Sequence, residues 1–129
     1  MKPDKIDYVN LCNEILGLSK KIRYVGIFYN NFSVGQMREG LTSLLTHEET
    51  VRSLKDALTR WKTRESLSNK LGKPHYAMTE YDKVKRITIP LPEDGILLVS
   101  TEPTMYHELI AKEIIEIRDR HSPIFRKGG

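Results

Sequence analysis

Apolar residues are spaced differently from one segment of the chain to the next, and each spacing predicts an element. Over Lys5–Leu16 they recur every three or four positions, which predicts an amphipathic helix. Ile22–Tyr29 and Phe32–Met37 are rich in β-branched and aromatic residues and predict two strands. Asn30-Asn31 between them tolerates the positive φ of a tight turn, so we expect a β-hairpin after the first helix.

A long helix is predicted over residues 46–71. Thr46-His47-Glu48-Glu49 matches the capping box, in which the threonine hydroxyl and the glutamate carboxylate each accept a free amide of the first turn. Gly72 followed by Pro74 is a typical helix stop. Roughly 24 residues at about 1.5 Å each make this the longest element.

Three strands are expected next, over residues 75–81, 84–91 and 96–100. They are joined by Asp82-Lys83 and by Pro92-Glu93-Asp94-Gly95, a turn with proline early and glycine late. The last strand is apolar on both faces, which places it near the centre of a sheet. A closing helix over 105–120 carries four apolar residues on one side, and residues 122–129 are expected to fray. The four are Leu109, Ile110, Ile114 and Ile117.

This order of elements predicts one α+β domain over residues 1–129. The expected sheet has five antiparallel strands in the order 2-1-5-4-3. The long helix covers one face, and the N- and C-terminal helices cover the other. Five strands spaced about 4.8 Å apart span roughly 20 Å, which the long helix can cross to connect the two edges.

The composition and the apolar runs of the sequence indicate the cellular location in which the protein is expected to act. It is 39% hydrophobic and 29% charged, as folded globular proteins are. No apolar run approaches the roughly 20 residues that cross a bilayer, and the first residues lack the apolar stretch of a secretory signal. We therefore expect a cytoplasmic protein that does not contact membranes. Cys12 is the single cysteine, so it forms no internal disulfide and is expected to be a small buried side chain.

A formal charge of +4 makes weak nucleic-acid binding a third hypothesis for the function. The long helix carries several basic residues, but acidic residues between them favour a solvated face. The basic residues are Arg52, Lys55, Arg60, Lys62 and Arg64.

Motifs for catalysis are absent from the sequence. The four histidines stand on separate elements without a second ligand at metal-binding spacing. Neither a nucleophile elbow, a phosphate-binding loop nor a dinucleotide fingerprint occurs. We expect no catalytic residues, no metal and no cofactor.

The hairpin, the long helix after Leu45 and the final strand, Asp94-Gly95-Ile96-Leu97-Leu98-Val99-Ser100, resemble the roadblock/longin/profilin-like superfamily, in particular small prokaryotic roadblock-like domains. This resemblance implies a non-enzymatic module that forms dimers, pairs through the third strand and the long helix, and regulates small GTPases or acts as a scaffold. The partner-binding residues implied here are Leu58, Trp61, Glu65, His75, Ala77 and Thr79. Trp61 also fits a core position facing the sheet.

Sensor domains of the PAS and Cache type share this strand order, so a small-ligand sensor is the alternative hypothesis. The segment from Gly35 to Gly40 would then contact a ligand, although it equally fits an edge strand bending into a loop. The pocket residues in this interpretation are Tyr24, Arg38, Tyr76 and Tyr81, because such a pocket needs apolar walls and a few polar groups.

Overall fold

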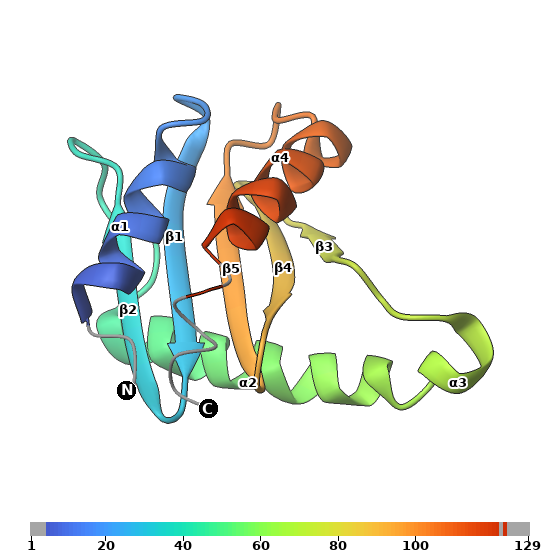
Figure 1. Ribbon diagram of the computed structural model, residues 1–129. Helices are drawn as coiled ribbons and strands as arrows, with labels where there is room; N and C mark the ends of the chain where they lie inside the picture. Colours follow the sequence, from blue (N-terminus) through green and yellow to red (C-terminus); the bar gives the residue numbers. More distant parts are fainter. Residues whose placement is uncertain (1–4, 122, 124–129) are drawn as a thin grey trace.

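The computed structural model describes residues 5–121 and 123, which form a five-stranded sheet with helices on both faces (Figure 1). The strand order is β2-β1-β5-β4-β3, and all neighbours are antiparallel. The predicted fold class and strand order are therefore confirmed. The predicted frayed tail lies outside the described residues, apart from Pro123. In chain order the elements are α1 (Lys5–Leu16), β1 (Ile22–Tyr29), β2 (Phe32–Met37), α2 (His47–Glu65), α3 (Ser68–Leu71), β3 (Ala77–Glu80), β4 (Lys85–Leu91), β5 (Gly95–Thr101) and α4 (His107–Arg120).

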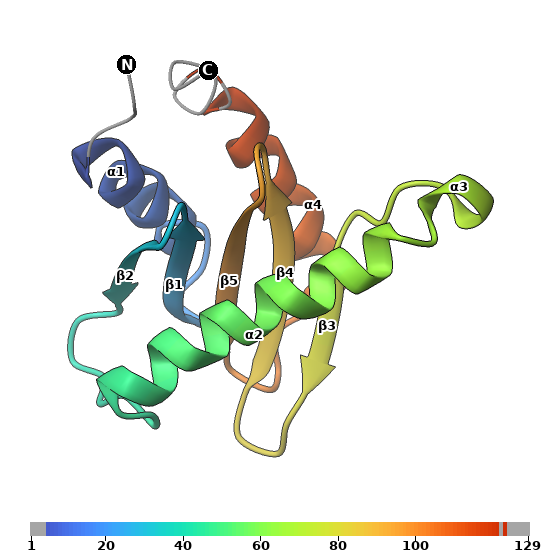
Figure 2. The ribbon, with the colours of Figure 1, turned by 90° about the horizontal axis from the view of Figure 1, so that it is seen from below.

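Two apolar cores lie on opposite faces of the sheet. The larger one lies under α1 and α4, where alternate residues of β1, β4 and β5 meet the buried sides of both helices. The smaller one lies under α2, which crosses the other face obliquely (Figures 1 and 2). Its buried residues are Phe28, Leu54, Ala57, Trp61, Ile96 and Leu98. Because α2 is the one described helix on this face and buries only three residues against it, part of the face is left uncovered.

The long helix begins as predicted but ends early. Thr46 Oγ1 accepts the Glu49 amide at 3.1 Å, and the Glu49 carboxylate accepts the Thr46 amide at 2.9 Å. The hydrogen bond from the Thr46 backbone lowers the pKa of Glu49. The predicted continuation to Leu71 is wrong, because the Ser66 hydroxyl donates to the Thr63 carbonyl at 2.6 Å and the helix stops at Glu65. The single turn α3 follows.

The third strand is shorter than the predicted 75–81, because the ladder with β4 begins at Ala77, opposite Thr88. Continuing it would bring His75 opposite Pro90, which has no amide to donate. α4 begins at His107 rather than at 105, and Leu109, expected on its buried side, is 59% exposed. Ala111 is buried there together with Ile110, Ile114 and Ile117.

Both hairpin turns are tight, although Gly95 is not used as predicted. Asn30 and Asn31 have φ of 51° and 62°, as expected for the β1–β2 turn. In the β4–β5 turn Glu93 and Asp94 adopt positive φ instead of the glycine. Gly95 is needed for packing, because a Cβ there would lie 2.5 Å from Cδ2 of Tyr29.

Cys12 is expected to be unreactive in the folded protein. Its side chain is fully buried in the larger core, and burial raises its pKa to about 12, so almost no thiolate forms near neutral pH. Labelling with a disulfide reagent at pH 8 should be at least about 100-fold slower than in guanidinium chloride. Labelling of the native protein at the rate of a free thiol would show that α1 opens readily.

Candidate functional site

Two surfaces on the α2 side of the sheet are candidates for function. The first, called here the α2/β3 surface, consists of the exposed side of α2, the turn α3 and the strand β3. Ala77 packs against the small core together with Leu58, and Thr79 points to solvent on the same face. Glu65 ends α2 and His75 precedes β3, both exposed. The structure thus brings the residues predicted for partner binding to one region, except for Trp61.

Trp61 lies beneath α2 rather than on its surface. Its side chain is 1% exposed and packs in the small core, so the structure favours the core interpretation of this residue. Its indole Nε1 is buried without a hydrogen-bond partner among the described residues. The Arg64 guanidinium lies 5.9 Å from the centre of the ring. A partner reaching α2 would therefore touch Arg64 before Trp61.

The sheet edge at β3 is open. β3 pairs only with β4, so its outer backbone groups face away from every other described strand. Figures 1 and 2 show the end of α2 running out past this edge and α3 lying beyond it. There Leu67 is 55% exposed and Leu71 is 78% exposed. Exposed apolar side chains and an unpaired strand edge therefore lie at the same end of the sheet (Figure 1).

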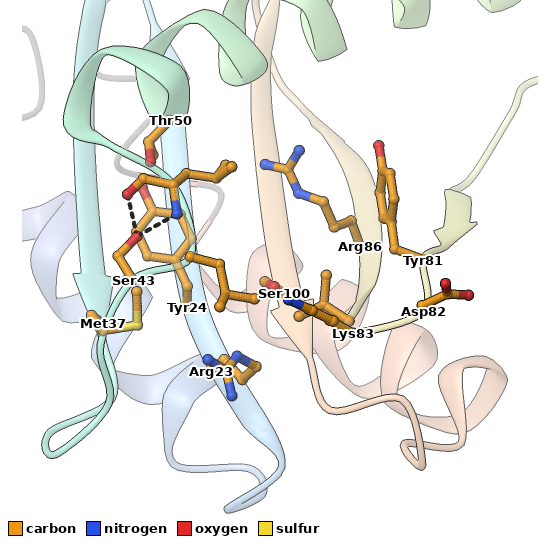
Figure 3. Close-up of a pocket in the computed structure, with 13 residues that line it drawn as sticks. Arg23, Tyr24, Met37, Ser43, Thr50, Tyr81, Asp82, Lys83, Arg86 and Ser100 are labelled. Atoms are coloured by element: carbon orange, nitrogen blue, oxygen red, sulfur yellow. Dashed lines mark hydrogen bonds between the residues drawn. The ribbon is translucent and has the colours of Figure 1, made fainter.

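The second candidate is a cavity of about 470 Å³ between the start of α2, the sheet and the β3–β4 turn (Figure 3). Its floor is formed by Tyr24, Arg86 and Ser100, which lie on three adjacent strands. Arg23 also lines it, because the β1–β5 register shifts between Ile22 and Tyr24. Other lining residues include Met37, Leu44, Leu45, Tyr81, Lys83 and Val84.

Arg86 is the half-buried cation of this cavity. Its Nη2 donates to Ser53 Oγ at 2.9 Å, and Tyr81 lies on the same side of the cavity (Figure 3). Burial lowers the pKa of Arg86, and the nearby charge of Arg60 acts in the same direction. Arg23 differs, because its guanidinium is paired with Glu102 at 3.0 Å.

Tyr24 lies over two glycines on neighbouring strands. Gly26 and Gly35 are paired across the β1–β2 hairpin, and a Cβ on either would collide with the Tyr24 ring. At Gly26 it would lie 2.7 Å from the phenol oxygen. Burial raises the pKa of Tyr24 to about 12. The glycine pair thus lets the ring lie flat across the sheet and form part of the floor of the cavity.

Gly26→Ala is expected to lower the free energy of unfolding by about 1–3 kcal/mol, because the new methyl group displaces the Tyr24 ring. Denaturant unfolding measures this loss. Tyr24→Ala is the matched background, in which the methyl group meets open space and Gly26→Ala should cost much less. If Gly26→Ala lowered the free energy of unfolding equally in the wild type and in Tyr24→Ala, the Tyr24 ring would not require a glycine at position 26.

Of the four residues predicted for a ligand pocket, the structure places two at the cavity. Tyr24 and Tyr81 line the cavity, whereas Tyr76 packs against the larger core. The expectation for Arg38 is wrong, because its guanidinium donates to the carbonyls of Leu16, Ser19 and Ile22 at 2.5, 2.7 and 2.6 Å. Arg38 therefore holds the loop between α1 and β1 through its Nε and Nη2 atoms.

Within the described residues, no group of three or more histidine, cysteine, aspartate or glutamate side chains is placed to hold a metal ion. Nor does any helix in that part of the chain combine the length and apolarity needed to cross a membrane.

No family model and no curated protein matches this chain. Several solved structures, however, do match it. A Roadblock/LC7 domain from Streptomyces avermitilis aligns with a TM-score of 0.71 at 10% identity, over 93% of this chain and 97% of that one. An MglB structure with a tetrameric arrangement aligns with a TM-score of 0.76 at 9% identity, over 97% and 91%. LokiProfilin1, solved in complex with rabbit actin, aligns with a TM-score of 0.54 at 14% identity, over 95% and 98%.

At such low identity these alignments establish the fold and nothing finer. The chain has a roadblock/longin/profilin-like fold, as expected from its sequence.

Proposed function

We propose that this chain is a non-enzymatic protein-interaction module that works as a homodimer, paired through the α2/β3 surface. The observation that carries the proposal is the open β3 edge together with the exposed Leu67 and Leu71, which lie at the start and end of α3 beyond the same edge (Figure 1). The residues proposed to lie in or next to the interface are Leu58, Glu65, Leu67, Leu71, His75, Ala77 and Thr79.

An open strand edge is a template for another strand, and two copies related by a two-fold axis can satisfy each other. Antiparallel pairing of β3 with its copy would extend the sheet across the dimer. β3 has only four residues, so its ladder alone would bind weakly. Further contacts are therefore needed beside it.

α3 supplies those contacts in the proposal. Leu67 and Leu71 have little of this chain to pack on, since the turn lies beyond the sheet (Figure 2). Burying these leucines against a second copy would stabilise the dimer by up to about 1.5–3 kcal/mol for Leu71 and by about half as much for Leu67, which is 55% exposed. The MglB structure with its tetrameric arrangement is an assembly of a chain with this fold.

The dimer would in turn bind a second protein. A small GTPase is the class of partner that the roadblock resemblance implies, and we propose it as the regulated protein. The exposed side of α2 carries both charges, with Arg52, Lys55, Arg60 and Lys62 interspersed with acidic residues, so it does not by itself select an acidic partner surface. Nucleic-acid binding by the same residues stays a prediction.

Light scattering of size-fractionated protein at tens of micromolar tests the pairing. The wild type should have twice the 15.0 kDa of one chain, and Leu67→Gln/Leu71→Gln should be monomeric with unchanged folding. Leu109→Gln on α4 is the matched control, because it removes an equally exposed leucine far from the surface and should stay dimeric. A monomeric wild type, or a dimer that survives the double substitution, would contradict the proposal.

A further inference from the structure

Arg86 is a cation that no carboxylate compensates in the described part of the chain. Its hydrogen-bonding partner Ser53 and its neighbour Tyr81 are both neutral, and the charged side chain that perturbs it is another arginine, Arg60. A guanidinium has five donors in a planar fork that matches an oxyanion. A half-buried guanidinium without a counter-ion is costly, and an anion bound beside it would relieve that cost.

The rest of the cavity fits an apolar body rather than a bare ion. Tyr24 and Tyr81 supply aromatic surface, and Met37, Leu45 and Val84 supply aliphatic surface. A volume of about 470 Å³ lies within the range of about 300–1,000 Å³ typical of small-molecule sites. Figure 3 shows Arg86 and Tyr81 on one side of this space and Tyr24, Met37 and Ser43 on the other.

The charges around the cavity also favour a negative ligand. Lys83 and Asp82 are both exposed at its rim and offset each other, and Arg23 is offset by Glu102. Among the described residues, Arg86 is thus the lining cation without a compensating charge, and the nearby Arg60 adds to the positive charge on this side. At the rim Leu44 and Leu45 are 57% and 38% exposed, so a bound apolar body would remove part of their surface from water.

We propose that this cavity binds a small organic anion, an aromatic or branched aliphatic body carrying one carboxylate, with the carboxylate held by Arg86 and the body packed between Tyr24 and Tyr81. This site is separate from the leucines of α3 and does not depend on dimer formation. Of the four residues predicted from the sequence for a ligand pocket, this site includes Tyr24 and Tyr81 but not Arg38 or Tyr76.

The test uses 2-naphthoate and its neutral analogue 2-naphthamide, which have the same aromatic body. Isothermal titration of the wild type should show saturable binding of naphthoate, with the amide about tenfold weaker or worse. Arg86→Met should abolish this preference, while Lys112→Met, which removes one charge on the opposite face, should keep it. Both titrations are repeated on Leu67→Gln/Leu71→Gln, and naphthoate should bind that variant equally well, whether or not the wild type is a dimer.

A second measurement does not depend on a substitution at Arg86. Naphthoate added to ¹⁵N-labelled wild type should shift the Arg86 side-chain Nε–H and the amides of Thr50 and Ser100. Absence of binding at millimolar naphthoate, equal affinity for the amide, an unchanged preference in Arg86→Met, or shifts confined to other surfaces would each overturn the proposal.

Discussion

Trp61→Ala is expected to lower the free energy of unfolding by about 3–5 kcal/mol, the usual cost of removing a buried tryptophan. The ring is the largest side chain of the small core and is 1% exposed. Only Leu54 and Ala57 are buried beside it on α2, so little else holds the helix to the sheet. Denaturant unfolding followed by circular dichroism measures the loss.

Trp61→Phe separates the ring from its polar atom. It should lose less than about 2 kcal/mol, because an aromatic ring remains and the unsatisfied Nε1 donor is removed. Hydrogen exchange should also show weaker protection of α2 in Trp61→Ala, with α1 and α4 less affected. A cost below about 1 kcal/mol for Trp61→Ala would mean that this ring does not anchor α2.

Arg38→Met is expected to lower the free energy of unfolding by about 2–3 kcal/mol, because three charge-assisted hydrogen bonds to backbone carbonyls would be lost and such bonds are strong. These carbonyls belong to the end of α1, the loop after it and the start of β1. The substitution keeps much of the aliphatic stem, so packing changes little. Thermal and denaturant unfolding both report it.

Arg23→Met is the control for Arg38, since it removes an arginine from the neighbouring strand. Its partner Glu102 is 39% exposed, and such pairs contribute about 1 kcal/mol or less. If Arg38→Met and Arg23→Met lowered the free energy of unfolding equally, the carbonyl contacts of Arg38 would contribute no more than the partly exposed ion pair of Arg23.

The sheet could be predicted from sequence because period-two patterns and tight turns fix strands locally. Asn30-Asn31 defined the first hairpin, and the doubly apolar run Ile96-Leu97-Leu98-Val99 identified the central strand β5. The ends of elements were less predictable. The start of β3 depends on Pro90 across the ladder, and the end of α2 depends on the Ser66 hydroxyl, which hydrogen-bonds to the Thr63 carbonyl.

The cavity was harder to predict because polar residues on a strand look alike in sequence. Arg86 alternates with apolar neighbours as any solvated residue would, and only the packing of α2 and the β3–β4 turn around it makes it half-buried. A usable signal was present in the hairpin. A two-residue turn at Asn30-Asn31 sets Gly26 opposite Gly35, and a glycine pair in mid-strand indicates a side chain lying across it.

Contacts between two copies along β3 are the most direct test of the proposed pairing. Mixing ¹⁵N-labelled and ¹³C-labelled protein makes only intermolecular nuclear Overhauser effects visible. We expect them between the amides of residues 77–80 and the same strand of the other copy, and to the methyl groups of Leu67 and Leu71. Intermolecular effects confined to β2 or to the α1 and α4 face, or none at concentrations where the mass is that of a dimer, would contradict this account.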